Sequence, residues 1–397
     1  MGILRDIWKE LWKNSSRFKW AIYSLGFLFL IAITKNLVSN DRPLLCKTQD
    51  KWMIPVLASN ASGIDWYSNS YSFAIWPVVP FRASTIDLRN SGFQPPGSKA
   101  NIGKKQSTHL LGTDGLGRDV LAALINGTSI ALIISLGVVA ISLIIGLLLG
   151  IAAGYFGNKR FHLSKYSLLI ILSLALISFY FQWIIIKTHH SPAWILCISI
   201  FLWTLWGMIS SILSKKIKLG NQIEIPVDSI IMRGIELFRS VPVLVLLLVL
   251  TSALSTNGVL PVILIISLFS WTAIARYSRA EAHKLRDMPF VLSGRISGIP
   301  NRKIMIRHLL PNVLTPVIVS ATFLMAGSVL AESALSFLGI GLEADTVSWG
   351  SLLSESRKNP AAWWIAVFPG LAIYLYVLIW NSIGEQISTY LQSKKLI

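Results

Sequence analysis

The chain has 397 residues, of which 53% are hydrophobic and only 14% are charged. Soluble globular chains carry about 25% charged residues, so the composition excludes an ordinary soluble domain and indicates a protein that crosses a membrane several times. The net charge of +18 would suggest a nucleic-acid partner in a soluble protein, but we expect none here, because basic loops that fix the orientation of membrane spans account for it.

The first 38 residues are expected to form an amphipathic helix at the membrane surface, followed by the first span. The apolar side of the amphipathic helix repeats at helical spacing and consists of Leu4, Ile7, Trp8, Leu11 and Trp12. The run from Trp20 to Val38 then crosses the membrane, and no small-x-small cleavage site follows it. Residues 39–127 are polar, and their apolar stretch SFAIWPVVPF is short and broken by prolines, so this segment is expected outside the membrane.

Residues 128–397 are expected to form a transmembrane domain, which makes the chain an all-α polytopic membrane protein. With the first span, the apolar runs amount to about eight spans, the others lying near 130–155, 166–187, 192–213, 235–255, 258–275, 313–338 and 363–384. Gly146, Gly150 and Gly154 recur every four residues, which places small residues on one helix face and favours close packing.

The distribution of Lys and Arg predicts that both termini lie in the cytoplasm. In that orientation the inner loop 276–312 holds eight of these residues and the stretch 1–19 holds five, whereas the short outer loops near 188–191 and 255–258 hold none. The segment 39–127 holds nine, but long loops are translocated regardless of charge, so it is expected to be extracytoplasmic.

One inner loop, about residues 277–312, is long for a connection between spans. Its stretch FVLSGRISGIPNRKIMIRHLLPN (290–312) carries four basic residues and no acid, and it predicts two short helices around a Gly-Ile-Pro break, with Pro311 at the start of the next span. A solvated basic loop would explain the charge but not the length. A short helix that docks into a soluble partner would explain the length as well.

This loop resembles the cytoplasmic coupling loop of ABC importer permeases, in which Glu-Ala-Ala, three residues and Gly precede His-x-Leu-Pro-Asn. The residues that correspond to this pattern are Leu292, Ser293, Gly294, Arg295, Gly298, His308, Pro311 and Asn312. The first three stand at the Glu-Ala-Ala positions, so the acid is missing. The resemblance implies that the loop docks an ATPase subunit.

Further motifs resemble the oligopeptide and dipeptide permeases of this family, of the second-permease type. The stretch HLLGTDGLGRDV is similar to their His-Pro-Leu-Gly-Thr-Asp…Gly-Arg-Asp-Val signature, and its matching residues are His109, Gly112, Thr113, Asp114, Gly117, Arg118 and Asp119. VDSIIMRGIELFRSVPVLVL, WTAIAR, AESALSFLGIG, SWG and FPG follow in the family order. About 67 residues between AAGYFGN and IPVDSIIM depart from the family pattern, and they hold the spans 166–187 and 192–213 as an inserted hairpin at about 159–225.

The resemblance implies a permease subunit of an ATP-driven ABC importer in the bacterial inner membrane, for di- or oligopeptides. It implies as partners a second homologous permease, two cytoplasmic ATPase subunits and an extracytoplasmic substrate-binding protein, besides membrane lipid. The chain has no phosphate-binding Gly-x4-Gly-Lys-Ser/Thr motif, so the ATPase subunits would bind ATP and Mg, and this chain would be a non-catalytic subunit without a cofactor. Cys46 and Cys197 lie far apart and indicate neither a disulfide framework nor a metal site.

Two other classes of function stay open from the residues alone. An ion-coupled secondary transporter needs an ionisable group in the middle of the membrane, but the candidates Lys35, Lys187 and Glu332 are expected near span ends, where their charges reach water. An integral-membrane enzyme could act through residues 39–127, although nothing there places an acid–base pair. Stimulated ATP hydrolysis in a purified complex would separate both classes from an ABC importer.

Overall fold

The protein is described by a computed structural model at residues 2–48, 51–56, 66–67, 71–100, 107–158, 162–164, 222–242, 245, 249, 258–343 and 346–393. Its helices are α1 (Gly2–Asn14), α2 (Ser16–Val38), the 3-10 turn η1 (Leu88–Asn90), α3 (Val120–Phe156), α6 (Val227–Ser240), α8 (Val259–Leu285), α9 (Pro289–Ile296), α10 (Asn301–Ile304), the π-helical turn η2 (Met305–Leu309), α11 (Leu310–Phe337), α12 (Trp349–Ser356) and α13 (Trp363–Ser393). Its strands are β1 (Leu45–Thr48), β2 (Lys51–Met53), β3 (Phe73–Ile75), β4 (Ser98–Ala100), β5 (Ser107–His109), β6 (His162–Ser164) and β7 (Gln222–Glu224).

Five helical runs among the described residues are long and apolar enough to cross a membrane. They are Ser16–Val38, Val120–Phe156, Val259–Leu285, Asn301–Phe337 and Trp363–Ser393. These runs correspond to five of the expected spans and confirm an all-α polytopic fold. The expected hairpin lies outside the described residues, as does most of the span expected near 235–255, so the total of eight spans stays a prediction.

Two of these helices begin or end well away from the positions that hydrophobicity predicts. α3 begins at Val120 rather than near residue 130, because the Asp119 carboxylate accepts a hydrogen bond from the Ala122 N–H at 2.7 Å and caps the first turn. α8 continues to Leu285, and the next helical run that is long enough to cross a membrane begins at Asn301. The connection between these two spans is therefore residues 286–300, shorter than the loop 277–312 that the sequence predicts.

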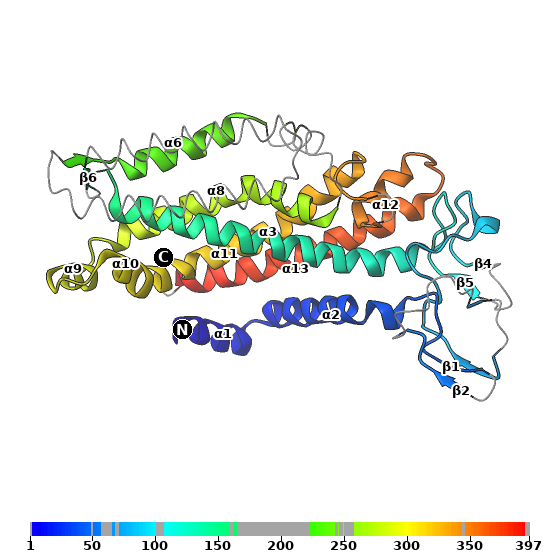
Figure 1. Cartoon of the computed structure of the whole chain (residues 1–397). Helices are drawn as coiled ribbons and strands as arrows, with labels where there is room; N and C mark the ends of the chain where they lie inside the picture. Colours follow the sequence, from blue (N-terminus) through cyan, green and yellow to red (C-terminus); the bar gives the residue numbers. More distant parts are fainter. Residues whose placement is uncertain are drawn as a thin grey trace. The chain divides into compact units, whose positions relative to one another are not determined.

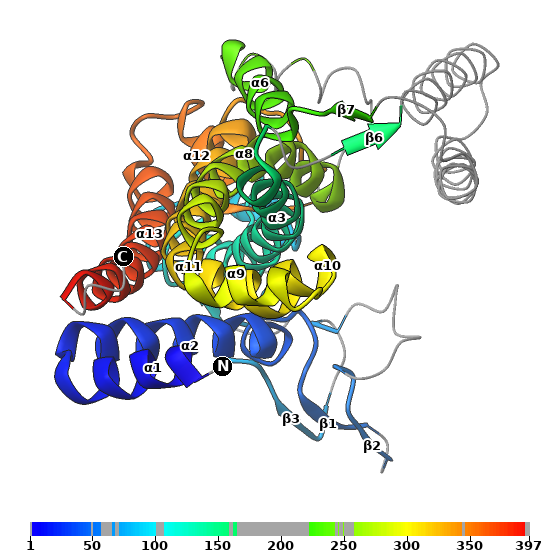
Figure 2. The same cartoon turned by 90° about the vertical axis from the view of Figure 1, so that its left-hand side faces the viewer.

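α3, α8, α11 and α13 run side by side, and α2 packs along α13 (Figures 1 and 2). The apolar core between α3, α8 and α11 consists of Ile130, Ile134, Val138, Val262, Ile263, Ile265, Ile266, Phe269 and Leu335. A second cluster joins α3, α11 and α13, and inside it the hydroxyls of Ser135 and Tyr376 lie 2.5 Å apart. Buried hydroxyls of this kind satisfy each other where neither water nor charge is present.

Two of the three predicted small residues bring α3 into close contact with α8. The Ser278 hydroxyl donates to the Gly146 carbonyl at 3.2 Å. A Cβ atom on Gly146 would lie 2.7 Å from the Ile274 Cβ, and one on Gly150 would lie 2.7 Å from the Ser278 Oγ. Any larger residue at these two positions would therefore have to push the helices apart.

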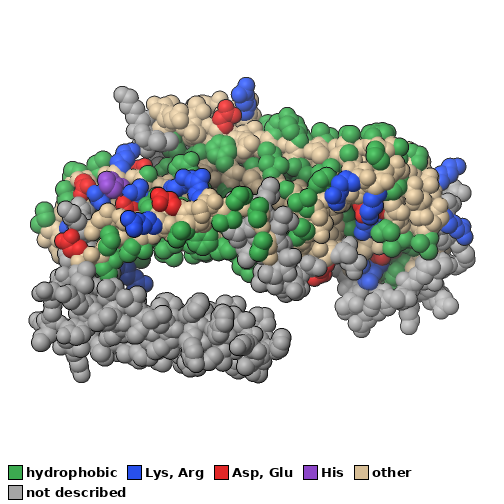
Figure 3. Space-filling model, turned by 90° about the horizontal axis from the view of Figure 1, so that it is seen from above, with side chains coloured by type: hydrophobic (Ala, Val, Ile, Leu, Met, Phe, Trp, Pro, Cys, Tyr) green, Lys and Arg blue, Asp and Glu red, His purple; other side chains and the backbone are tan. Residues whose placement is uncertain are grey.

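The strands β1 to β5 and the connection between α8 and α11 lie at opposite ends of this bundle (Figure 1). At one end β2, β1 and β3 form a three-stranded sheet and β4 pairs with β5. At the other end lie α9, α10, α1 and the last turns of α13, where the Tyr390 hydroxyl donates to Glu10 at 2.9 Å and the Ser15 hydroxyl to Gln386 at 2.7 Å. Figure 3 shows charged side chains gathered toward the two ends of the face in view and hydrophobic side chains over much of the surface between them.

Residues 152–234 form a separate compact unit. Within it β6 pairs with β7 in antiparallel fashion, with His162 opposite Glu224. The Asp228 N–H donates to the Gly157 carbonyl at 3.2 Å, and the Ser229 N–H donates to Asn158 at 3.1 Å. The described residues on the two sides of 165–221 therefore lie next to each other, as the flanks of an inserted segment would.

Candidate functional site

The signature residues 109–119 fold into a buried group at the start of α3, here called the His109 cluster together with Phe81 and Asp87. The His109 ring is buried and stacks on the Phe81 ring, with 4.4 Å between the centroids. Its Nδ1 lies 2.8 Å from the Asp119 Oδ2, and its Nε2 lies 3.6 Å from the Asp87 Oδ2. Because the other oxygen of Asp119 caps α3, this one carboxylate joins the histidine to the helix terminus.

Asp114 and Thr113 organise the loop of the His109 cluster. The Asp114 Oδ1 accepts the N–H groups of Leu116 and Arg118, both at 2.9 Å, and its Oδ2 accepts the Arg118 Nε–H at 2.6 Å. The Thr113 hydroxyl donates to the Asn90 carbonyl at 2.9 Å. The three donors from Leu116 and Arg118 satisfy the buried Asp114 carboxylate, whose burial without partners would be strongly unfavourable.

Two glycines and a tryptophan complete the His109 cluster. Gly112 and Gly117 have φ values of 81° and 82°, which other residues adopt at a cost. A Cβ on Gly112 would lie 2.6 Å from the Gln94 carbonyl oxygen, and one on Gly117 would overlap the Asp87 carbonyl. The Trp364 Nε1–H donates to the Thr113 carbonyl at 3.2 Å, which ties the loop to the start of α13. These contacts join the signature loop to the first turn of α3 and to the start of α13.

The sequence pattern names His109 and Asp119 but not the residues that surround them. Phe81, Asp87 and Trp364 come from distant parts of the chain, and no spacing rule connects them to residue 109. Of the three, Asp87 carries a local signal, because it precedes a short turn and accepts the Arg89 N–H at 3.1 Å in the manner of a helix cap.

The predicted docking loop is a bent pair of short helices, here called the α9–α10 elbow (residues 288–304). α9 ends in a Schellman motif, in which the Ile299 N–H donates to the Gly294 carbonyl at 3.0 Å and the Gly298 N–H to the Arg295 carbonyl at 2.9 Å. Gly298 has φ of 71°, the left-handed conformation that this motif requires. The predicted break at Gly298 is therefore present in the structure, with α10 starting at Asn301 after Pro300.

α9 has one face toward the protein and one toward the outside. Val291 and Gly294 are buried, and a Cβ on Gly294 would make ordinary contacts with Ile299 and Ile304 at 3.8 and 3.9 Å. On the other side Leu292 is exposed and Ile296 is 88% exposed. Of the predicted docking residues, the structure thus gathers Leu292, Ser293, Gly294, Arg295 and Gly298 on α9 and its cap.

The remaining docking residues, His308, Pro311 and Asn312, lie inside the helical run that follows. Pro311 lies in the first turn of α11, as the sequence predicts, but α10 and η2 extend the helical run back to Asn301. The π-helical turn η2 precedes the proline, and the Leu310 N–H donates to the Met305 carbonyl across it. Asn312 donates to the His308 carbonyl at 2.7 Å. A widened turn of this kind relieves the clash between a proline ring and the preceding turn, so the helix continues through Pro311.

Glu332 is buried, although its position near the end of a predicted span suggests a carboxylate that reaches water. Its side chain is 2% exposed rather than reaching water, and its carboxylate accepts the hydroxyls of Ser336 at 2.7 Å and Ser333 at 3.3 Å. Across the parts of the chain that the structure describes, no group of three His, Cys, Asp or Glu side chains is placed to hold a metal ion.

Comparison with known proteins agrees with the order of the motifs. Residues 217–395 match the family described as binding-protein-dependent transport system inner membrane component. The chain is 29% identical over 304 residues to a putative peptide transport system permease protein of Brucella suis biovar 1, covering 76% of this chain and 75% of the relative. It is 25% identical over 404 residues to the inner membrane ABC transporter permease protein YejE of Escherichia coli K12, covering 97% and 96%.

A third relative, the peptidoglycan transport system permease protein YejE of Agrobacterium fabrum, is 23% identical over 424 residues, covering 98% of this chain and 93% of the relative. Among solved structures, the MetNI methionine ABC transporter aligns with 67% of this chain and 96% of that chain, at a TM-score of 0.40 and 15% identity. Residues 217–395 thus match the inner membrane components of binding-protein-dependent transport systems, and a relative similar over nearly the whole chain is an ABC transporter permease, which supports a permease of an ABC importer.

Proposed function

We propose that this ABC importer permease conducts di- or oligopeptides across the inner membrane together with a second homologous permease. Two relatives are named as components of a peptide and a peptidoglycan transport system, which supports a cargo with peptide bonds. An extracytoplasmic binding protein would deliver this cargo. Two cytoplasmic ATPase subunits would bind ATP and Mg and drive the transport, so the chain itself needs no cofactor.

The proposed orientation places both termini and the α9–α10 elbow in the cytoplasm. The support is the excess of Lys and Arg in the predicted inner loops. α1, the end of α13 and the elbow lie at one end of the bundle, as this orientation requires (Figure 1). Residues 39–119 would then be outside the cell membrane, where a binding protein could reach them.

The outer face of α9 is the proposed docking surface for an ATPase subunit. The exposure of its apolar side chains is the observation on which this part of the proposal depends. Leu292 and Ile296 are four residues apart and therefore lie on the same side of the helix. Both are exposed although they are apolar. An apolar helix face that lies in a groove of a partner is a common mode of recognition. Burying a side chain of this size stabilises a complex by about 1.5–3 kcal/mol.

The test uses the importer complex reconstituted in proteoliposomes with its binding protein and a peptide mixture. Ile296→Asp should reduce both the co-purification of the ATPase subunits and the peptide-stimulated ATP hydrolysis, because it puts a charge into the docking surface. Leu88→Asp is the matched control, since Leu88 is 81% exposed at the other end of the bundle. Full retention of the ATPase subunits by Ile296→Asp would overturn the docking surface, and peptide uptake without ATP would overturn the function.

A further inference from the structure

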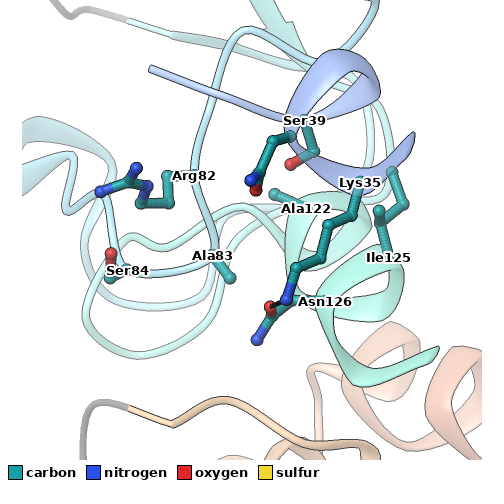
Figure 4. A pocket seen from close by; sticks show the side chains of 9 residues that line it. Lys35, Ser39, Arg82, Ala83, Ser84, Ala122, Ile125 and Asn126 are labelled. Carbon is teal, nitrogen blue, oxygen red and sulfur yellow. Dashed lines mark hydrogen bonds between the residues drawn. The ribbon is translucent and has the colours of Figure 1, made fainter. Parts of the chain in front are cut away.

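A cavity of about 340 Å³ lies where α2 ends and α3 begins, at the end of the bundle that carries the strands (Figure 4). Its walls come from the last turn of α2, the loop after Phe81 and the first turns of α3. The lining residues are Lys35, Asn36, Ser39, Arg82, Ala83, Ser84, Ala122, Ile125 and Asn126. This volume falls in the range of small-molecule sites, about 300–1,000 Å³.

Two basic side chains, Lys35 and Arg82, line the cavity, and they have different partners within the chain. The Lys35 ammonium donates to the Asn126 Oδ1 at 3.3 Å, and within the described part of the chain this neutral amide is its hydrogen-bond partner. An ammonium has three donors, so Lys35 keeps two of them for a ligand. Arg82 is exposed, and its Nε lies 4.0 Å from the Asp41 Oδ1, a distance too long for a hydrogen bond. The Ser39 hydroxyl already donates to the Phe81 carbonyl at 2.7 Å, so the cavity offers positive charge and the Ser84 hydroxyl, which suits an oxyanion.

Beyond the buried residues 127–132, apolar side chains are exposed again along the membrane-spanning part of α3. Ile133 lies two helical turns after Asn126 and so on the same face. Ile133, Leu136 and Ile144 are all exposed in the chain. Ile125 and Ala122 form the apolar side of the cavity itself. A ligand that fits both parts has an anionic head and a hydrocarbon tail.

We propose that this cavity binds the phosphate group of a membrane phospholipid, with an acyl chain along the exposed face of α3. Lys35 supplies the main charge, and Arg82 and Ser84 line the opposite wall, from which the Arg82 side chain would have to turn toward the phosphate (Figure 4). Basic pockets between transmembrane helices on the cytoplasmic side of membranes hold phospholipid head groups through the same contacts. The orientation under Proposed function would place the lipid in the outer leaflet, but the binding itself does not depend on that orientation.

The test measures lipid binding to the purified full-length chain, stripped of lipid in a neutral detergent. Native mass spectrometry follows the titration with phosphatidylglycerol. Lys35→Gln should raise the dissociation constant about tenfold, the ratio expected for the loss of one hydrogen bond between charged groups. Lys35→Arg should retain binding, which shows that the substituted chain folds. Arg89→Gln is the control, because Arg89 is an exposed cation of the same segment that does not line the cavity.

Three outcomes would overturn the proposal. The first is equal affinity of Lys35→Gln and the unaltered chain. The second is an equal loss in Lys35→Gln and Arg89→Gln, which would mean that lipid binds through general surface charge. The third is displacement of the lipid by inorganic phosphate in molar excess, because the cavity would then be a site for a soluble anion. Transport activity is not a readout here, so failure of this proposal is distinct from failure of the proposed function.

Discussion

Replacing Gly150 by Leu should weaken the contact between α3 and α8. A Cβ at this position would lie 2.7 Å from the Ser278 Oγ and 2.9 Å from the Ser278 Cβ, and it would overlap the Ala275 carbonyl oxygen. That oxygen belongs to the backbone of α8, so a change of rotamer cannot move it away. Overpacking of this kind costs about 1–3 kcal/mol. Because Leu adds three further carbon atoms, we expect a loss near the upper end of this range.

The assay is the free energy of unfolding of the chain in detergent, from titration with a denaturing detergent followed by tryptophan fluorescence. Gly327→Leu is the matched control, since a Cβ on Gly327 in α11 would meet no atom within 4 Å. This control should unfold at the same midpoint or later, because glycine destabilises a helix by roughly 0.5–1 kcal/mol. If Gly150→Leu unfolds at the midpoint of the unaltered chain, then α3 and α8 do not touch at this position, and the reasoning fails.

Three further predictions concern the elbow, the His109 cluster and the insertion. Gly298→Val should abolish peptide uptake at unchanged membrane abundance, because a left-handed conformation costs a side chain about 1–2 kcal/mol, whereas Gly294→Ala, whose Cβ makes ordinary contacts, should transport normally. Asp119→Ala should lower the free energy of unfolding by about 2–4 kcal/mol through the lost cap and the lost histidine contact, and Asp119→Asn, which can still cap, should lose less. Replacing residues 162–224 by a short glycine-serine link should leave membrane insertion and permease assembly intact, and loss of the protein on removal would show that this segment is part of the core.

The positions of the spans could be predicted from hydrophobicity because each span satisfies its own backbone in the membrane. The ends of the helices could not be predicted from hydrophobicity, since polar residues determine where each helix begins or ends. Asn126 and Thr128 lie inside α3, where Thr128 donates to the Leu124 carbonyl at 3.1 Å and Asn126 to the Val347 carbonyl at 3.2 Å. The start at Val120 depends on the Asp119 cap, and passage through Pro311 depends on η2. Neither feature has an apolar pattern.

The candidate site was predictable in its parts but not in its assembly. Local chemistry revealed the break at Gly298, because a glycine followed by Ile-Pro predicts the end of a helix. The exposed position of Ile296 required the structure, since α9 is apolar on both faces and the burial of Val291 decides which face is inside. The assembly of the His109 cluster also required the structure, because Trp364 and Thr113, which form a hydrogen bond there, are 251 positions apart in the sequence.

The contact between Gly150 and Ser278 also determines where the proposed docking surface lies. Ser278 is seven residues before Leu285, the end of α8, so the contact is about 10 Å along the helix from that end. α9 follows directly after Met288 and is joined to it by a hydrogen bond from the Val291 N–H at 2.9 Å. The position of α9 therefore follows the position of α8, and α8 is fixed against α3 at this contact. Gly150→Leu should then lower both the stability of the bundle and the stimulated ATP hydrolysis, whereas Gly298→Val, whose strain is confined to the elbow, should lower the stimulated ATP hydrolysis without destabilising the bundle. A normal ATPase response in Gly150→Leu, measured on folded complex, would show that the elbow is positioned by α11 rather than by α8.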